Sequence, residues 1–333
     1  MTKPSPVIVV TGGSAGAGRA IARRFGAEGW RVGLIARDEG RLEATRREIE
    51  AFRGQAMVQA ADMAEAAAVF RARDAILAEW GQIDVWVNAA MVTVVGPISR
   101  VTPEEFRRVT EVTYLGYVHG SLAALEAMRP ADRGMIVQVG SALAYRAIPL
   151  QAAYCAAKFA VRGFTDSLRT ELRHEGSGIH MSMVQLPGMN TPQFDWARNT
   201  FQHKYRPVGA VFDPDVAADA VQRAVRSRPR ELWVGGSAIQ AIVGQMLAPA
   251  LLDRILARTA WAGQIDTVDE DPGRSDNLGA PVAGDVGARG RFGEEARPRA
   301  MMLDPETVRW GVAAALVLVG LAGLAGLGRR GRA

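Results

Sequence analysis

Tyr154 and Lys158 lie four residues apart in the stretch AAYCAAKFA, an alanine-rich run that predicts a helix. Residues at this spacing share one face of an α-helix. A phenol with a pKa near 10 is a weak acid–base at neutral pH, but a nearby ammonium stabilises the phenolate and lowers that pKa. The pair could therefore pass a proton to or from a substrate oxygen, with Tyr154 as general acid/base. Spacing alone is weak evidence, because chance produces such a pair in roughly 5% of chains of this composition, and an ordinary packed helix is the alternative.

A glycine-rich loop lies near the N-terminus, where the β-rich run VIVVT leads into TGGSAGAGRAIARRF. Gly12, Gly16 and Gly18 fall between the predicted strand and the predicted helix. Because glycine has no Cβ, it permits a tight turn and lets a diphosphate approach the N–H groups at the positive end of a helix dipole. The loop therefore predicts nucleotide binding, with a purely structural turn as the alternative.

The end of the second predicted strand, LIARDEGRL, bears on the choice of cofactor. A site that prefers NAD usually ends this strand in a carboxylate that binds the ribose hydroxyls. Here Ala36 is followed by Arg37, with Arg41 one helical turn further on, and guanidinium groups suit a 2′-phosphate. We therefore expect NADP(H) to be preferred over NAD(H). Asp38 is better explained as a helix N-cap than as a ribose ligand, and Arg41 could alternatively be a surface charge.

The sequence between residues 7 and 235 alternates short β-rich runs with helical patterns. This order predicts right-handed crossovers and an α/β fold, a doubly wound parallel sheet of the Rossmann-like type with about seven strands. The strand candidates are VIVVT, RVGLIA, QAMVQA, IDVWVN, GMIVQV, IHMSMV and ELWVG.

A C-terminal extension follows this domain, which we place at residues 1–235. Residues 236–262 predict one or two apolar helices, interrupted at Pro249, that cover a pocket or touch a membrane surface. Residues 263–309 contain many glycines and prolines and few large apolar side chains, a composition that predicts a flexible linker.

Residues 310–328, WGVAAALVLVGLAGLAGLG, carry no charge and precede a basic tail, 329–333. As a helix the segment would extend about 28 Å, close to the roughly 30 Å of hydrocarbon in a bilayer. We expect it to anchor a cytoplasmic domain to the membrane. Gly320, Gly323 and Gly326 recur at helical spacing and favour close helix–helix approach, so a packing or oligomerising helix is the alternative.

Composition argues against several other classes of protein. The 40 Lys and Arg residues against 35 Asp and Glu give a net charge of +5, but the arginines are dispersed among acids and no basic run is interleaved with aromatics, so we expect no nucleic-acid site. The single cysteine, Cys155, excludes an intramolecular disulfide and is expected to be a packing residue. The four histidines do not cluster at metal-ligand spacing, so no metal site is predicted. The N-terminus does not have the pattern of a secretory signal.

Over roughly residues 6–235 these motifs resemble the short-chain dehydrogenase/reductase family, in its compact single-domain branch. TGGSAGAG is similar to the family's glycine motif and YCAAK to its Y-x-x-x-K motif. Ser141 ends a predicted strand 13 residues before Tyr154, at the family's offset. The stretch LPGMNT, residues 186–191, is similar to the family's Pro-Gly and Thr segment beside the nicotinamide.

The resemblance implies hydride transfer between a nicotinamide and a carbonyl or alcohol. In that family the serine orients the substrate oxygen, and the lysine also binds the nicotinamide ribose. Asp62, in AADMAE, is similar to the position beside the adenine, although a helix cap is the alternative. The catalytic residues implied are Ser141, Tyr154, Lys158 and Thr113. The cofactor-binding residues implied are Thr11, Gly12, Ser14, Gly16, Gly18, Arg37, Arg41, Asp62, Asn88, Tyr154, Lys158, Pro187, Gly188 and Thr191.

Two departures from the family pattern concern the proton path. The family's N-N-A-G segment is NAAM here, which retains Asn88 but has Ala89 and Met91 at the later positions. Thr113 stands where the family usually has an asparagine that holds a relay water beside Lys158, and threonine has one fewer donor and a shorter reach. We still expect a working enzyme, slower or with a different water path. His203 is a pocket candidate, but a surface position is the preferred interpretation.

Three functional hypotheses follow. The leading one is an NADP(H)-dependent oxidoreductase acting on a hydrophobic alcohol or ketone, in view of the apolar residues 238–252. A reductase of soluble carbonyl substrates is the second. The third is a catalytically quiet, dinucleotide-binding regulatory or scaffold protein, suggested by Thr113 and NAAM. The family resemblance also implies a homodimer or homotetramer formed through the long helices 103–129 and 151–176.

Overall fold

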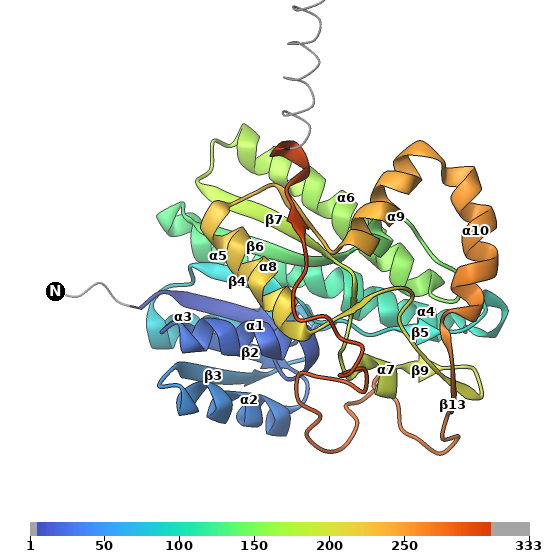
Figure 1. The fold of residues 1–333 in the computed structure, drawn as a ribbon. Helices are drawn as coiled ribbons and strands as arrows, with labels where there is room; N and C mark the ends of the chain where they lie inside the picture. The colour runs from blue at the N-terminus through green and yellow to red at the C-terminus, as the bar shows by residue number, and fades with distance from the viewer. Residues whose placement is uncertain (1–4, 308–333) are drawn as a thin grey trace, which may run out of the picture.

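The computed structural model describes residues 5–307, and an eight-stranded sheet forms its centre (Figure 1). The strand order is β14-β12-β7-β6-β4-β1-β2-β3. Neighbouring strands pair in parallel except β14, which runs antiparallel to β12 at one edge. All seven predicted strands are confirmed, and β14 is added by the extension. The strands are β1 Val7–Thr11, β2 Arg31–Ala36, β3 Gln55–Ala60, β4 Val85–Asn88, β6 Gly134–Ser141, β7 Ile179–Leu186, β12 Glu231–Val234 and β14 Met302–Leu303.

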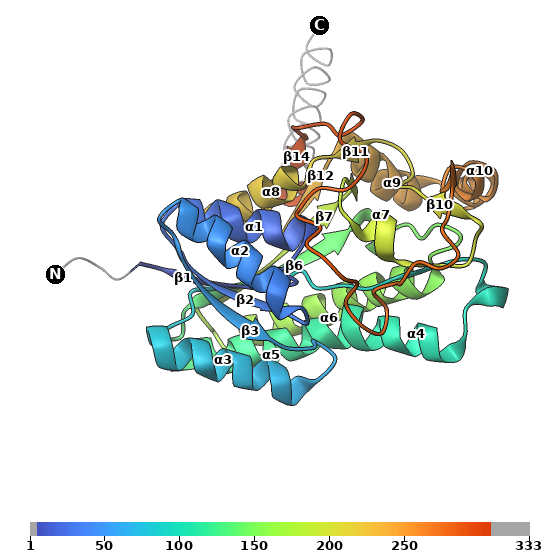
Figure 2. The same cartoon turned by 90° about the horizontal axis from the view of Figure 1, so that it is seen from below.

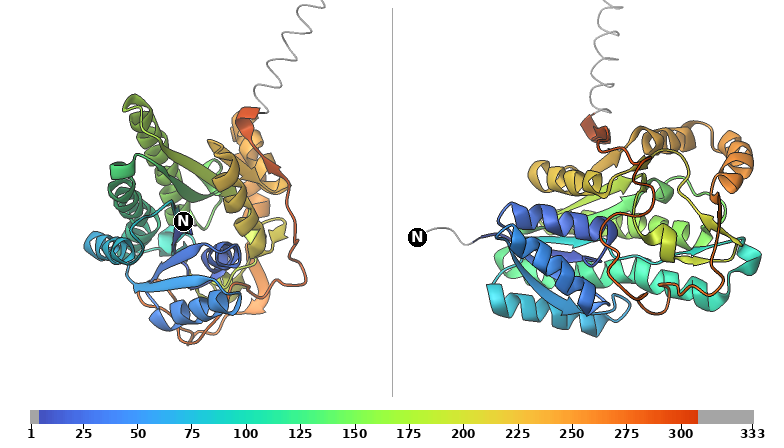
Figure 3. Two further views of the ribbon diagram at one scale, coloured as in Figure 1. Left: turned by 90° about the vertical axis from the view of Figure 1, so that its left-hand side faces the viewer. Right: turned by 60° about the horizontal axis from the view of Figure 1, so that its bottom comes forward.

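Helices cover both faces of the sheet, as the doubly wound prediction requires (Figure 2). One layer consists of α1 Gly16–Ala27, α2 Glu39–Ala51 and α8 Pro214–Ser227. The opposite layer consists of α3 Ala66–Trp80, α4 Pro103–Thr110, α5 Gly116–Met128 and α6 Ala152–His174, with a π-helical turn, Glu111–Leu115, between α4 and α5. Figure 3 shows the two layers on either side of the sheet.

Strand β1 explains why the sheet has two cores. Its apolar residues alternate between the two faces: Ile8 and Val10 pack in the cluster under α1 and α8, while Val7 and Val9 pack in the cluster under α3 and α5. All four side chains are fully buried. A continuous β-branched run such as VIVVT is therefore what a central parallel strand with both faces covered requires.

Smaller elements extend from the carboxyl ends of the central strands. Residues 236–262 form a helical hairpin of α9 Gly236–Leu247 and α10 Pro249–Ala262, which breaks at Pro249. Three two-stranded ladders lie nearby, together with a short helix. These are β5 Val94–Val95 with β9 Arg198–Asn199, β8 Gly188–Met189 with β11 Val211–Phe212, β10 His203–Tyr205 with β13 Ile265–Asp269, and α7 Gln193–Trp196.

The predicted flexible linker differs most from expectation, because its described part packs on the domain. Residues 275–290, which we call the strap, cross the N-terminal end of α1 and the end of β2 (Figure 2). Asp285 pairs with the buried Arg19, and the Gly16 N–H donates to the Gly287 carbonyl at 3.2 Å. Few apolar side chains are needed to hold such a segment, because hydrogen bonds to charged groups hold it instead.

The expected membrane localisation is corrected by the structure. Within residues 5–307, no helix is long and apolar enough to cross a bilayer. The apolar stretch 236–262 divides into two short helices, because Pro249 begins a new helix and α9 ends before it. The segment 310–328, to which the anchor was assigned, and the tail 329–333 lie outside the described residues.

Candidate active site

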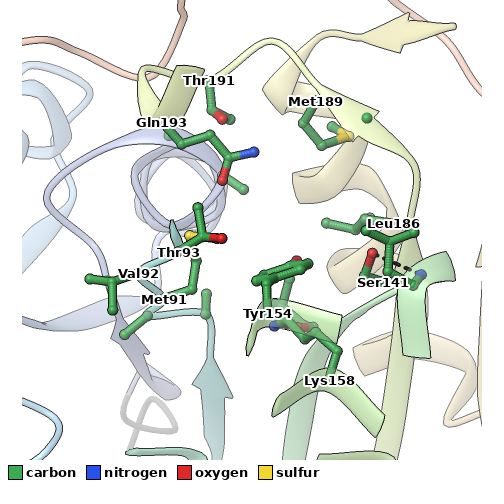
Figure 4. A pocket seen from close by; sticks show the side chains of 18 of the residues that line it. Met91, Val92, Thr93, Ser141, Tyr154, Lys158, Leu186, Met189, Thr191 and Gln193 are labelled. Atoms are coloured by element: carbon green, nitrogen blue, oxygen red, sulfur yellow. Dashed lines mark hydrogen bonds between the residues drawn. The ribbon is translucent and has the colours of Figure 1, made fainter. Parts of the chain in front are cut away.

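A cavity of about 520 Å³ opens at the carboxyl ends of the central strands. Its lining runs from the glycine loop, past the end of β2, to Ser141 and Tyr154. Figure 4 shows the part around Ser141 and Tyr154. This is the end of an open parallel sheet at which ligands bind in doubly wound folds. Its volume lies in the range of roughly 300–1,000 Å³ that is typical of small-molecule and cofactor sites.

The glycine loop has the geometry that a phosphate group needs. Gly12 has a φ of +71°, and a Cβ there would lie 2.8 Å from Ala90 Cα. A Cβ on Gly18 would lie 2.2 Å from the Gly12 carbonyl oxygen, so this contact of loop and helix requires glycine. Gly16, with a φ of +56°, begins α1, whose N-cap side chain makes no hydrogen bond. The Gly16 N–H donates to the Gly287 carbonyl of the strap, and the N–H groups that follow it at the start of α1 fit an anionic diphosphate.

Two predicted cofactor residues do not line the cavity but make hydrogen bonds beneath its wall. The Thr11 hydroxyl accepts hydrogen bonds from the N–H groups of Ala89 and Ala90, at 3.0 and 3.3 Å, and so holds the NAAM loop against the glycine loop. Asn88 is fully buried, where its amide accepts from Trp86 at 2.9 Å and donates to Gln138 at 2.9 Å. Both residues position the loop that forms one wall of the cavity.

Arg37 and Arg41 line the end of the cavity near β2, as predicted, but the strap already occupies their donors. Arg37 donates to the carbonyls of Asn277, at 2.6 Å, and Gly279, at 3.0 Å. Arg41 donates to the Gly284 carbonyl at 2.7 Å and to that of Val282. Burial lowers the pKa of both guanidinium groups, which marks a place where positive charge is poorly solvated.

Two aspartates beside these arginines have local roles. Asp38 is the N-cap of α2, as expected, and accepts from the Arg41 N–H at 3.0 Å. Asp62 lines the cavity, accepts from the Ala64 N–H at 2.9 Å and pairs with Arg108. Its position permits contact with an adenine. Its local bond closes a turn ahead of α3 and does not cap that helix, whose N-cap is Glu65, so the helix-cap alternative is wrong.

The three proposed catalytic residues meet on one wall of the cavity, at the positions labelled in Figure 4. Ser141 ends β6, and Tyr154 and Lys158 lie one turn apart on α6. The Ser141 hydroxyl accepts from the Leu143 N–H at 3.1 Å, and Ser141, Tyr154 and Lys158 all line the cavity. The sheet therefore supplies Ser141, and the helix that covers it supplies Tyr154 and Lys158.

Burial dominates the acid–base properties of this wall. It lowers the pKa of the Lys158 ammonium to about 7. It raises the pKa of the Tyr154 phenol well above 10, and the nearby Ser141 hydroxyl offsets part of that rise. We expected Lys158 to lower the pKa of Tyr154. The net direction is the opposite, because desolvation is the largest cause and Lys158 Nζ lies 5.6 Å from the centre of the Tyr154 ring.

Thr113 is fully buried and does not line the cavity. Its hydroxyl accepts from the Val92 N–H at 3.0 Å and donates to the Val92 carbonyl at 2.8 Å. The group beside Lys158 is instead Tyr117, whose hydroxyl lies 2.9 Å from Nζ. Sequence reasoning missed Tyr117, although it lies one turn after Thr113 on the same predicted helix and was visible in TYLGYVHG.

Four further predicted residues lie after β7 in the chain. Pro187, Gly188 and Thr191 line the cavity, and Thr191 faces the glycine loop, 3.3 Å from the position of a Cβ on Gly16. His203 does not line the cavity; it is exposed and pairs with Asp269 at 2.9 Å, as its preferred interpretation required.

The other end of the cavity is apolar and includes residues that the sequence did not single out. The hairpin α9–α10 contributes Ala238, Leu252 and Leu256, and β8 and α7, which follow β7, contribute Met189 and Phe194. The apolar pattern of residues 236–262 was the signal for this wall. Within residues 5–307 no group of three or more His, Cys, Asp or Glu side chains could hold a metal ion.

Comparison with known proteins agrees with this geometry. A family model described as short chain dehydrogenase matches residues 6–201. The uncharacterized oxidoreductase YxnA of Bacillus subtilis is 29% identical over 262 residues, which cover 78% of this chain and 73% of that protein. A metagenomic short-chain oxidoreductase solved in complex with NADP is 32% identical, with a TM-score of 0.55, over 66% of this chain and 90% of that chain. The alcohol dehydrogenase of the archaeon Thermococcus sibiricus, solved with 5-hydroxy-NADP, is 25% identical, with a TM-score of 0.59, over 69% of this chain and 96% of that chain. The family match covers more than half of the chain, so this protein belongs to the short-chain dehydrogenase/reductase family.

Proposed function

We propose that this protein transfers a hydride between NADP(H) and a hydrophobic alcohol or ketone, with Tyr154 as general acid/base. The observation that carries the proposal is the single cavity that joins the glycine loop to Ser141, Tyr154 and Lys158 and ends at an apolar wall. Two solved structures similar to this chain carry NADP or 5-hydroxy-NADP, and one is described as an alcohol dehydrogenase.

The nicotinamide would supply the hydride for the substrate carbon, and the protein's side chains handle the oxygen. In the direction of reduction, Tyr154 donates its proton to the carbonyl oxygen, which becomes the alcohol hydroxyl. Its raised pKa keeps the phenol protonated at neutral pH, as a general acid requires. The Ser141 oxygen accepts the Leu143 N–H, so its own proton is free to orient the substrate oxygen. Lys158, when charged, stabilises the phenolate that remains.

The preference for NADP(H) rests on Arg37 and Arg41. The strap offers these guanidinium groups neutral backbone carbonyls, whereas a 2′-phosphate carries nearly two negative charges and several acceptor oxygens. The phosphate is therefore the stronger partner for both arginines. Its binding would require the strap carbonyls to give way locally.

We propose that a substrate with an apolar body binds between β8 and α7 on one side and the hairpin α9–α10 on the other. Met189, Phe194, Leu252 and Leu256 line this part of the cavity. We also propose a homodimer or homotetramer formed through the α5 and α6 side of the domain, where Leu122 and Phe159 are 44% and 42% exposed.

Turnover of a graded panel of carbonyl compounds tests the proposed function. Purified protein should oxidise NADPH with aldehydes and ketones, and kcat/KM should rise with the length of the apolar chain, by about threefold to fourfold for each buried methylene. NADPH absorbance at saturating cofactor measures the rate.

Two other results would change the assignment. If no carbonyl were reduced and no alcohol oxidised, while NADPH still bound by fluorescence titration, the protein would be a quiet dinucleotide binder. A preference for short polar carbonyls would favour the soluble-substrate hypothesis.

The strap is expected to slow the exchange of cofactor. Arg19 is 2% exposed and pairs with Asp285 of the strap and with Glu48 of α2. Asp285→Ala leaves Arg19 paired with Glu48 but removes the anchor of the strap beside the glycine loop. The dissociation rate of NADPH, measured by stopped-flow displacement, should rise about tenfold, the effect of losing one hydrogen bond to a charged group.

Glu294→Ala is the control for that measurement, because this exposed residue lies just beyond the strap. Equal dissociation rates in wild type and Asp285→Ala would contradict a role of the strap in cofactor exchange.

A further inference from the structure

Tyr117, Lys158 and the carbonyl of Val139 form a closed triangle beneath the catalytic wall. Lys158 Nζ donates to the Tyr117 hydroxyl and to the Val139 carbonyl, both at 2.9 Å. The Tyr117 hydroxyl donates to the same carbonyl at 2.9 Å. Lys158 Nζ also lies 4.5 Å from the centre of the Tyr117 ring. Tyr117 and Lys158 are 1% and 2% exposed, so this arrangement lies away from bulk water.

The close packing of α5 brings Tyr117 to this position. A Cβ on Gly116 would lie 2.9 Å from Met63 Cβ, and one on Gly120 would lie 2.1 Å from Asn88 Oδ1. The two glycines therefore let α5 approach the sheet more closely than a larger residue would allow. The π-helical turn Glu111–Leu115 directly precedes this contact, and such turns occur often at functional sites.

The triangle leaves one N–H of the lysine for the cavity. An ammonium has three donors, and two of them are taken by Tyr117 and Val139. The third is available on the side on which Lys158 lines the cavity. Thr113 does not hold Lys158 in this way, because its hydroxyl already accepts from the Val92 N–H and donates to the Val92 carbonyl.

We infer that Tyr117 is the positioning residue for Lys158 in this protein, with its hydroxyl in the place of the relay water that an asparagine at position 113 would hold. The inference rests on the proposed function and deepens it. The buried phenol keeps its proton, because burial and the neighbouring Tyr154 both raise its pKa. On the side of Tyr117 and Val139, Lys158 therefore contacts a protonated hydroxyl and a carbonyl, neither of which can accept its proton. Proton exchange between Lys158 and solvent must run through the cavity.

The groups that face the ammonium are few. Tyr154 lies on its own helix, Tyr117 comes from α5, and the Val139 carbonyl comes from β6. Among residues 5–307, no carboxylate pairs with Lys158. Tyr117→Phe removes one of the two acceptors that stabilise the charged amine, so the pKa of Lys158 should fall below its value of about 7.

Tyr117→Phe in the full chain tests the inference. We expect kcat to fall about tenfold at pH 7.5, whereas the KM for carbonyl and for NADPH should stay within about twofold. The alkaline limb of the plot of kcat against pH should move about one pH unit lower, because the ammonium loses one hydrogen bond. Tyr114→Phe is the matched control, because Tyr114 is a half-buried tyrosine on the preceding turn that does not line the cavity.

A second measurement does not depend on turnover. The chain has three lysines, at 3, 158 and 204, so labelling lysine with ¹³C at Cε gives three signals whose titration can be followed by NMR. The midpoint of Lys158 should be lower in Tyr117→Phe than in wild type, whereas Lys204 should not change. If the protein proved inactive on every carbonyl, the proposed function would fail, but this midpoint would still decide the role of Tyr117.

An unchanged Lys158 midpoint together with an unchanged kcat profile would overturn the inference. So would a loss of thermal stability and activity without any shift in either pH dependence, because that combination indicates packing alone.

Discussion

Tyr154→Phe should reduce kcat for carbonyl reduction by about a thousandfold, within the 10²–10⁴ contributed by a positioned general acid. The change removes one oxygen from a ring that α6 and β6 hold in place. Without the phenol, this wall of the cavity retains the Ser141 hydroxyl and the Lys158 ammonium. Neither group occupies the position from which the Tyr154 hydroxyl would donate its proton. Steady-state NADPH oxidation over pH 5–10 measures the loss.

NADPH affinity is the control within that experiment. The dissociation constant of the Tyr154→Phe variant should stay within about threefold of wild type, because the glycine loop and Arg37 do not contact this ring. Tyr114→Phe, a second conservative removal of a phenol, should have wild-type kcat. Should Tyr154→Phe keep more than a tenth of wild-type kcat, another group must supply the proton, and the assignment of Tyr154 fails.

Arg37→Ala should raise the KM for NADPH by about 30-fold to 100-fold while changing the KM for NADH by less than about threefold. Hydrogen bonds to a charged phosphate contribute roughly 1.5–3 kcal/mol, and each 1.4 kcal/mol is a factor of ten in binding. The ratio of kcat/KM for the two cofactors measures this directly. Burial is the main reason that the pKa of Arg37 is lowered, and the charge of Asp62 offsets part of that effect. A phosphate would give this poorly solvated guanidinium a second negative partner.

The comparison with NADH separates the phosphate from the strap. Arg37 also donates to Asn277 and Gly279, so the substitution loosens the strap as well. That effect acts on both cofactors equally, whereas loss of the phosphate contact acts on NADPH alone. Arg47→Ala, an exposed arginine further along α2, is the control for a simple change in net charge. An equal rise in both KM values would show that Arg37 serves the strap and not the 2′-phosphate.

Local patterns were sufficient for the fold of the domain and for placing two of the proposed catalytic residues on one helix. The β-branched runs and glycine loop predicted seven strands and the start of α1, because strand period and turn geometry depend on neighbouring residues. The spacing of Tyr154 and Lys158 places them one turn apart on any helix, and the structure has both on α6. Ser141 was added by the family resemblance, from its offset of 13 residues before Tyr154.

Residues 263–309 were wrongly predicted to form a flexible linker. The composition of a segment indicates how much apolar surface it can bury, but not which charged groups elsewhere in the chain bind it. Residues 275–290 contain few apolar side chains, so their sequence alone suggested a chain without a core. Arg19, Arg37 and Arg41 bind this segment although they lie more than 200 positions away in the chain. No local pattern around the arginines or in residues 275–290 predicts these contacts. The expected membrane anchor rested on the hydropathy of residues 310–328, which lie outside the described residues, and within residues 5–307 no helix is long and apolar enough to cross a bilayer.

The sequence by itself determined the family and the doubly wound sheet, because both depend on residue type and short-range spacing. It also supplied the residues that we propose move a proton. Only the tertiary structure decided which group supports Lys158 and what covers Arg37. Thr113 was the natural candidate from position, but its hydroxyl is used by Val92, and the close approach of α5 brings Tyr117 to the lysine instead. Contacts of this kind depend on how closely a helix packs on a sheet, which is a property of the whole fold.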